Sequence, residues 1–173
     1  MVQHSLLVAH WWPFWKTTSS SSTTTSTPED DEQAIVDQYL GFWDARFEAN
    51  SEPVNPDLPA LADFATGAQL DNVIAETQRR KEGGLAVRLP DDSIGERRVK
   101  VASVEGDQAV LLDCATNDTV LYRVDTGEVI DDSVATRSIE ATMRLVDGKW
   151  RLAGTRELQK WEGVAGCAVS SDF

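Results

Sequence analysis

The two best candidates for proton transfer in this sequence are an aspartate and a tyrosine. Asp113 lies between Leu112 and Cys114 in a strongly apolar segment, and Tyr39 lies in a segment of helical spacing that holds several aromatic residues. A carboxylate and a phenol in one apolar site can act as base and hydrogen-bond donor, because loss of water shifts their pKa values. Three weaker candidates for such chemistry are Asp44, Glu140 and Arg144.

The same two residues also have structural interpretations. Tyr39 is more often a core aromatic whose hydroxyl forms a hydrogen bond with a backbone group. Asp113 can end a strand, or form an ion pair with Arg123 or Arg151. Residues 28–167 contain no histidine, although histidine is the commonest acid–base group at neutral pH. We therefore favour a non-catalytic role and keep catalysis as the alternative.

Composition and charge exclude several classes of protein. The chain has 173 residues, 16 Lys and Arg against 29 Asp and Glu, and a net charge of -13. This acidity argues against a nucleic-acid partner, because binding phosphates requires a basic surface. Two cysteines and two histidines cannot form the usual zinc sites, and no glycine-rich phosphate loop occurs, so we expect neither a metal nor a cofactor. No apolar run approaches the roughly 18 residues that span a bilayer.

Residues 1–27 differ in composition from the rest of the chain. A short apolar run at 6–9 precedes a tryptophan-rich cluster at 11–15, and a serine and threonine tract follows. The tract has no apolar side chain to bury, which predicts a flexible linker. Three interpretations stay open: a remnant of an export signal or anchor, an artefactual or disordered tail, and a binding peptide or membrane foot, since tryptophan favours membrane interfaces.

Helical signals dominate the chain from Pro28 to residue 84. Thr27 suits an N-cap, Pro28 suits the first helical position, and the four acids that follow complement the helix dipole. This first helix should run to about Asn50. Three prolines then break the chain, and a short second helix follows, which Gly67 ends or hinges. Apolar spacing predicts a third helix from about Leu70 to the glycine pair at 83–84.

After residue 84 the periodicity changes to that of strands. The segment 109–115 is apolar on both faces, which marks a central strand, and 138–146 alternates cleanly. An Asp-Gly pair at 147–148 predicts a tight hairpin turn. Helices followed by an antiparallel meander predict an α+β fold. The expected strands are 85–89, 97–104, 109–115, 119–124, 138–146 and 149–155.

This order of elements resembles the nuclear transport factor 2-like superfamily, whose fold is a cone-shaped, cystatin-like α+β structure. The resemblance covers residues 28–167, leaves 168–173 as a tail, and implies three helices packed on a curved antiparallel sheet of about five to six strands. Within that superfamily, the chain resembles poorly characterised secreted or membrane-tethered actinobacterial proteins. The features that carry this likeness are Tyr39 and Trp43, Leu111-Leu112-Asp113-Cys114, Asp125-Thr126-Gly127, the segment 146–151 and the late Cys167.

The resemblance also implies a cone-shaped pocket where the sheet curls around the first helix. Four aromatic residues would line or plug this pocket: Tyr39, Trp43, Phe47 and Phe64. The superfamily includes isomerases, dehydratases, polyketide cyclases and non-catalytic accessory domains, so the fold by itself does not choose a function.

The two cysteines have two interpretations. Cys114, in a predicted strand, is typical of a small buried apolar side chain. The resemblance, the even cysteine count and the Gly166-Cys167 tail favour instead a disulfide between Cys114 and Cys167. A disulfide indicates an oxidising compartment, which predicts an extracellular or cell-envelope protein; without it the protein would be cytoplasmic.

Together these observations predict a non-catalytic accessory or binding domain, exported or envelope-associated, that binds a protein partner or a small apolar ligand. Homodimerisation through the sheet is one form of such binding. The first alternative is a small-molecule isomerase or cyclase that uses the cone pocket. The second is a membrane-tethered module of a secretion or conjugation machine, whose N-terminal segment contacts the membrane.

Overall fold

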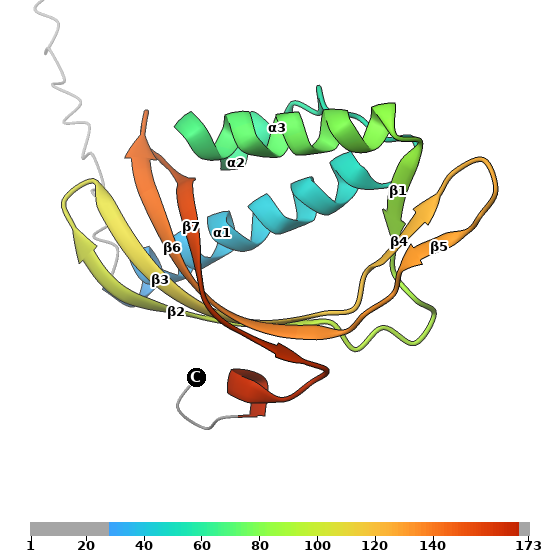
Figure 1. Cartoon of the computed structure of the whole chain (residues 1–173). Coiled ribbons are helices and arrows are strands. Elements are labelled where there is room, and N and C mark those ends of the chain that lie inside the picture. Colours follow the sequence, from blue (N-terminus) through green and yellow to red (C-terminus); the bar gives the residue numbers. More distant parts are fainter. Residues whose placement is uncertain (1–27, 170–173) are drawn as a thin grey trace, which may run out of the picture.

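Figure 1 shows a computed structural model of the chain, which describes residues 28–169. Helices come first and strands follow, and the helices pack on antiparallel sheets, so the predicted α+β class is confirmed. The expectations for the segment 1–27 and for most of the tail at 168–173 lie outside the described residues.

Three helices occupy the first part of the fold. They are α1 (Pro28–Asn50), α2 (Ala60–Phe64) and α3 (Gly67–Glu82). α2 ends at Phe64 and not at Gly67, which instead begins α3 with a positive φ of 56° and forms the predicted hinge between the two helices. Glycine adopts this left-handed conformation without the steric cost that a Cβ atom would add. The position lets the chain turn sharply from α2 into a second long helix.

The strands form two antiparallel sheets. The larger has the order β2-β3-β6-β7, with β2 (Glu96–Glu105), β3 (Gln108–Asn117), β6 (Ala135–Val146) and β7 (Lys149–Glu162). The smaller has the order β1-β4-β5, with β1 (Leu85–Arg88), β4 (Val120–Arg123) and β5 (Val129–Asp131). A short 3-10 helix, η1 (Gly166–Val169), closes the described part of the chain.

The described residues contain seven strands, one more than the six ranges expected. The extra strand, β5, has three exposed residues and therefore lacks the alternation that reveals a half-buried strand. β7 also runs to Glu162, beyond the predicted end at residue 155.

The hydrophobic core lies between α1 and the concave side of the larger sheet. The long strands curve beneath α1, and α3 lies on the other side of that helix (Figure 1). Burying apolar surface here supplies the main driving force for packing the helices on the sheet. The largest apolar side chains that are fully buried are Tyr39, Phe42, Ile35, Leu61, Leu111, Met143 and Leu152.

Strand register decides which side chains face α1. Arg97 of β2 lies opposite Ala115 of β3, which lies opposite Arg137 of β6. Asp113 lies two residues before Ala115, so it points to the same concave face. Cys114 points to the convex face. This alternation separates the residues of the candidate site from the disulfide.

Candidate functional site

Tyr39 and Asp113, the two candidates for proton transfer, form a hydrogen bond with each other. The Tyr39 hydroxyl donates to Asp113 Oδ2 at 2.7 Å, and both side chains are fully buried. The Arg97 guanidinium forms an ion pair with the same carboxylate oxygen. The suggested backbone partner for Tyr39 was therefore wrong, as were the suggested ion pairs of Asp113 with Arg123 or Arg151. We call Asp113, Arg97 and Tyr39 the sheet-side cluster.

Burial dominates the electrostatics of the sheet-side cluster. It raises the pKa of Asp113 above its ordinary value, although the Arg97 charge and the Tyr39 hydroxyl act in the opposite direction. Within the described part of the chain, Asp113 Oδ1 has no hydrogen-bond partner. The pKa of Tyr39 is also raised, first by burial and then by the negative charge of Asp113. Tyr39 therefore stays protonated and serves as a fixed hydrogen-bond donor.

The Trp43 ring packs against two members of the sheet-side cluster, Arg97 and Tyr39. The Arg97 guanidinium lies 3.7 Å from the centroid of the Trp43 ring, within the range of a cation–π contact. The Trp43 ring in turn meets the Tyr39 ring edge-on, with 6.1 Å between centroids. The cluster thus links α1 to β2 and β3 through charge, hydrogen bond and ring packing.

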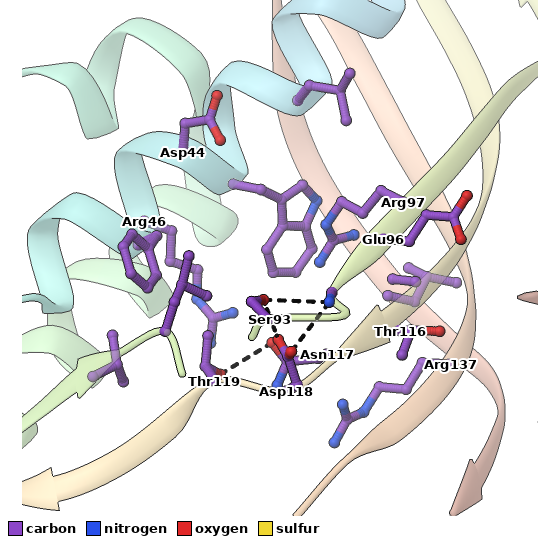
Figure 2. Close-up of a pocket in the computed structure, with 18 of the residues that line it drawn as sticks. Asp44, Arg46, Ser93, Glu96, Arg97, Thr116, Asn117, Asp118, Thr119 and Arg137 are labelled. Atoms are coloured by element: carbon purple, nitrogen blue, oxygen red, sulfur yellow. Dashed lines mark hydrogen bonds between the residues drawn. The ribbon is translucent and has the colours of Figure 1, made fainter. Parts of the chain in front are cut away.

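A cavity of about 660 Å³ lies between α1 and the sheets. Figure 2 shows it with Arg97 and Arg137 extending from strands on either side of β3. Of the four aromatic residues expected in the pocket, Trp43 and Phe47 line this cavity. Tyr39 does not line it, because its hydroxyl is directed to Asp113.

Phe64, the fourth aromatic residue, also lies away from the cavity lining. It belongs to α2 and packs against the core. A Cβ atom at Gly41 would collide with its ring, so α1 and α2 approach each other closely at this point. The role of Phe64 in the structure is to fix α2 on α1.

A loop before β2 forms part of the cavity rim and is held by Asp118. The Asp118 carboxylate accepts hydrogen bonds from the backbone N–H groups of Ile94 and Gly95 and from the Ser93 hydroxyl. Sequence reasoning missed Asp118, which follows Asn117 in what reads as an ordinary turn. The signal that could have found it is an aspartate at a strand end, where it can satisfy backbone donors.

A second group of charged side chains lies between α1 and α3. Glu76 pairs with Arg46 at 2.9 Å and with Arg80 at 2.7 Å. Arg80 also donates to Asn50 Oδ1 at 2.8 Å. Although burial alone would raise the pKa of Glu76, the adjacent guanidinium groups, Arg46 first, lower it overall. We call Glu76, Arg46 and Arg80 the helix-side cluster.

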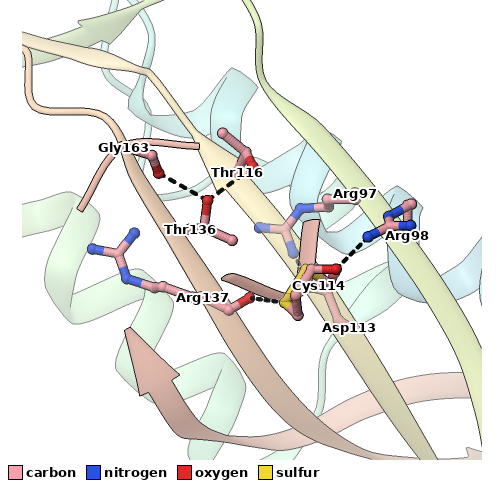
Figure 3. The surroundings of a disulfide bond; sticks show 9 residues. Arg97, Arg98, Asp113, Cys114, Thr116, Thr136, Arg137 and Gly163 are labelled. Atoms are coloured by element: carbon pink, nitrogen blue, oxygen red, sulfur yellow. Dashed lines mark hydrogen bonds and ion pairs between the residues drawn. A yellow bond between two sulfur atoms is a disulfide. The ribbon is translucent and has the colours of Figure 1, made fainter. Parts of the chain in front are cut away.

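The disulfide predicted between Cys114 and Cys167 is present. It joins β3 to η1 on the convex face of the larger sheet (Figure 3). Arg98 donates to the backbone oxygen of Cys167, and the Cys167 sulfur lies 3.8 Å from the backbone oxygen of Arg137. The disulfide therefore lies on the convex face of the larger sheet, opposite the concave face on which Arg97 and Arg137 lie.

The weaker candidates for chemistry do not join Asp113. Asp44 is exposed, although it contributes to the cavity lining. Glu140 pairs with Arg156 at 2.9 Å, and Arg144 pairs with Asp107 at 3.3 Å, both outside the cavity lining. Among residues 28–169, no group of three or more His, Cys, Asp or Glu side chains could hold a metal ion.

Comparisons with known proteins support the fold. No protein-family model matches the chain, and no curated protein sequence does. The structure is similar to the intermembrane space region of the chloroplast protein ARC6, with a TM-score of 0.58 and 12% identity over 74% of this chain and 96% of that one. A protein of unknown function with a cystatin-like fold from Nostoc punctiforme matches at a TM-score of 0.39 and 12% identity, over 76% and 91% of the two chains.

These likenesses concern architecture and do not transfer an activity. In the part of the chain that the structure describes, no helix is both long enough and apolar enough to cross a membrane. What the comparisons support is the fold, an α+β domain whose helices cover the concave side of an antiparallel sheet.

Proposed function

We propose that this chain is an exported, non-catalytic binding domain of the nuclear transport factor 2-like type, whose cavity between α1 and the sheets takes a small ligand with an apolar body. One observation carries the proposal. The cavity is large enough for such a ligand and is walled by Trp43 and Phe47, whereas the two groups best suited to proton transfer are bonded to each other outside its lining. Cavities of this volume are typical of sites that bind small molecules.

An isomerase or cyclase has less support. Such chemistry needs a base and a donor that reach the substrate. Asp113 is fully buried, and its Oδ2 atom already accepts from Tyr39 and pairs with Arg97. A substrate in the cavity would meet Trp43 and Arg97 first, because both line it.

The disulfide supports the exported location. Disulfides persist in oxidising compartments and are rare in reducing ones. The two cysteines are 53 residues apart in the chain, and closing a loop of that length stabilises a domain by about 4 kcal/mol on the chain-entropy estimate. We expect protein prepared without reductant to contain no free thiol, and reduction to lower the free energy of unfolding by about that amount. A thiol assay and urea denaturation measure both quantities; free thiols in the unreduced protein would contradict the exported location.

Binding itself can be tested with a neutral naphthylamine dye, N-phenyl-1-naphthylamine, whose emission rises in apolar sites. We expect saturable binding to the wild-type chain. Thr155 lines the cavity and is exposed, so Thr155→Phe should narrow the cavity without removing a core contact. This variant should weaken dye binding by at least about tenfold, which means that the Kd rises by about one order of magnitude.

The matched control is Arg156→Phe. Arg156 is the next residue of β7 and lies outside the cavity lining, so this variant adds the same ring outside the cavity. It should bind the dye as the wild type does. Absence of dye binding, or equal loss in both variants, would contradict the proposed function.

A further inference from the structure

Four arginines line the cavity of a chain that is strongly acidic overall: Arg46, Arg80, Arg97 and Arg137. Three of them pair with carboxylates that are less exposed than the partner of the fourth. Arg46 and Arg80 share Glu76 in the helix-side cluster, and Arg97 pairs with the buried Asp113. The fourth, Arg137, differs from them in its environment.

Arg137 is held by a weak and exchangeable partner. Its Nε donates to Glu157 at 3.1 Å, and the Glu157 side chain is 50% exposed. Exposed ion pairs of this kind contribute little to stability, because water competes for both charges. The pair engages Nε alone, so both terminal NH₂ groups of the guanidinium lie outside it. A guanidinium carries five N–H donors in a planar fork that matches an anionic group.

Four carboxylates also line the cavity, at Asp44, Glu96, Asp118 and Glu157, so its positive charge is local to the sheet row that carries Arg97 and Arg137. Asp118 is already occupied by the backbone of the rim loop and by Ser93. Asp44 and Glu96 are exposed. On the sheet, Arg97 and Arg137 flank the small side chain of Ala115, which places two guanidinium groups on one row of the concave face. Figure 2 shows both of them at the cavity.

Apolar side chains line part of the cavity, on both α1 and the sheet. Leu40, Trp43 and Phe47 come from α1, and Ile139 comes from β6, next to the row that holds the two arginines. A ligand in this space would contact aromatic and aliphatic surface as well as guanidinium groups. Apolar walls with a few convergent polar groups are typical of sites that fix the orientation of a small molecule.

From this arrangement we infer that the cavity binds a small organic anion, with its negatively charged group on Arg137 beside Arg97 and its apolar or aromatic body against Trp43 and Phe47. This inference rests on the proposed function and narrows the ligand class. Charge-assisted hydrogen bonds to a guanidinium are about twice as strong as neutral ones, so the anionic group would set both affinity and orientation.

Two dyes that differ in one group separate this inference from the proposed function. The first is 1-anilinonaphthalene-8-sulfonate, and the second is N-phenyl-1-naphthylamine, which has the same rings without the sulfonate. We expect the wild-type chain to bind the sulfonate more tightly than the neutral dye by about tenfold, the value of one good charge-assisted contact. Equal affinities would overturn the inference and leave the proposed function standing, whereas no binding of either dye would overturn both.

The key variant is Arg137→Gln, which keeps hydrogen-bonding capacity and removes the charge. It should weaken sulfonate binding by about tenfold and leave the neutral dye within about twofold. Arg137→Lys restores the charge without the fork and should recover part of the loss. Arg156→Gln is the matched control, because Arg156 lies outside the cavity lining, and it should change neither dye.

Two results would overturn the assignment of Arg137. One is an equal loss of both dyes in Arg137→Gln, which would mean that the side chain acts through packing. The other is unchanged sulfonate binding in the cavity-narrowing variant Thr155→Phe, which would place the dye elsewhere on the protein. Urea midpoints of each variant, compared with the wild type, show whether the fold is intact. Where it is intact, a loss of binding is due to the change in the cavity.

Discussion

The sheet-side cluster and the helix-side cluster are built from the same groups, a carboxylate with arginine, yet they behave in opposite ways. Asp113 is fully buried and has one arginine partner. The Glu76 side chain is 33% exposed and has two. The two clusters lie on either side of α1, so each fixes that helix to a different layer of the fold.

The pKa directions show which physical effect wins in each cluster. At Asp113 the loss of water outweighs one positive charge and one hydroxyl, so its pKa is raised. At Glu76 burial also acts to raise the pKa, but the charges of its arginine neighbours prevail and lower it. Burial and the number of counter-charges, not the presence of an ion pair, therefore decide whether the pKa of a carboxylate is raised or lowered.

The largest difference between the clusters should appear when an arginine is removed. Arg97→Met leaves the buried Asp113 without its counter-charge, and we expect a loss of about 3–5 kcal/mol in the free energy of unfolding. Arg46→Met removes one of two partners of a part-exposed carboxylate and should cost about 1 kcal/mol or less. Urea denaturation of both variants measures the contrast; similar losses would show that the clusters are equivalent.

A double variant tests the cause of that loss. If the cost of Arg97→Met comes from an uncompensated charge, adding Asp113→Asn should recover part of it. The double variant would then be more stable than the sum of the two single losses predicts. Additive losses would mean that Arg97 stabilises the fold by covering Trp43 and not by its charge.

The hydroxyl of Tyr39 gives the next largest effect. Tyr39→Phe keeps the ring in the core and removes the donor to Asp113, which should cost about 1.5–3 kcal/mol for a hydrogen bond to a charged group. Tyr122 supplies the control, since its hydroxyl donates to Glu52 at 3.1 Å in an exposed position. Tyr122→Phe should change the free energy of unfolding by less than about 0.5 kcal/mol. Equal effects at the two tyrosines would contradict the role given to burial.

A smaller effect is expected from the carboxylate of the helix-side cluster. Glu76→Gln removes both ion pairs, but exposure of the side chain limits the loss to about 1 kcal/mol. The loss should shrink in about 1 M NaCl, because salt screens exposed charges and reaches buried ones much less. Urea midpoints at low and high salt, with Tyr39→Phe as the salt-insensitive comparison, measure this. A salt-independent loss would place Glu76 in a drier environment than the structure gives.

The two clusters also differ in how far the sequence could predict them. The Glu76 and Arg80 pair is visible from the sequence, because residues four apart on a helix are neighbours. Tyr39 and Asp113 are recognisable by residue type and surroundings. Arg97 was not found, because its position depends on the register between β2 and β3.

That register contains a bulge that sequence pattern does not reveal. Glu105 pairs with Gln108 at the turn, and the pairing shifts by one residue between Val101 and Ser103. Counting back from the turn without the bulge would pair Arg98 with Ala115 and send Arg97 to the convex face. A shift of one residue moves every side chain of a strand to the opposite face. Pattern alone predicted most of the helices and strands, whereas the cavity arginines required the structure.

The smallest and most diagnostic difference lies in the pH dependence of stability. A raised folded-state pKa at Asp113 means that its contribution is fully present below the unfolded pKa, about 3.9, and is lost as the pH rises through the folded value. A lowered pKa at Glu76 means the reverse: its contribution is present above the unfolded pKa, about 4.3, and is lost as the pH falls through the folded value.

Unfolding free energies measured from about pH 3 to 7 for the wild type, Asp113→Asn and Glu76→Gln isolate the two contributions. The advantage of the wild type over Asp113→Asn should decrease as the pH rises, and its advantage over Glu76→Gln should increase. If both differences in unfolding free energy changed with pH in the same direction, the effects of Arg97 and Tyr39 on the pKa of Asp113 would together outweigh that of burial. The sheet-side cluster would then be a favourable ion pair like its counterpart, and the contrast between the two sides of α1 would reduce to exposure alone.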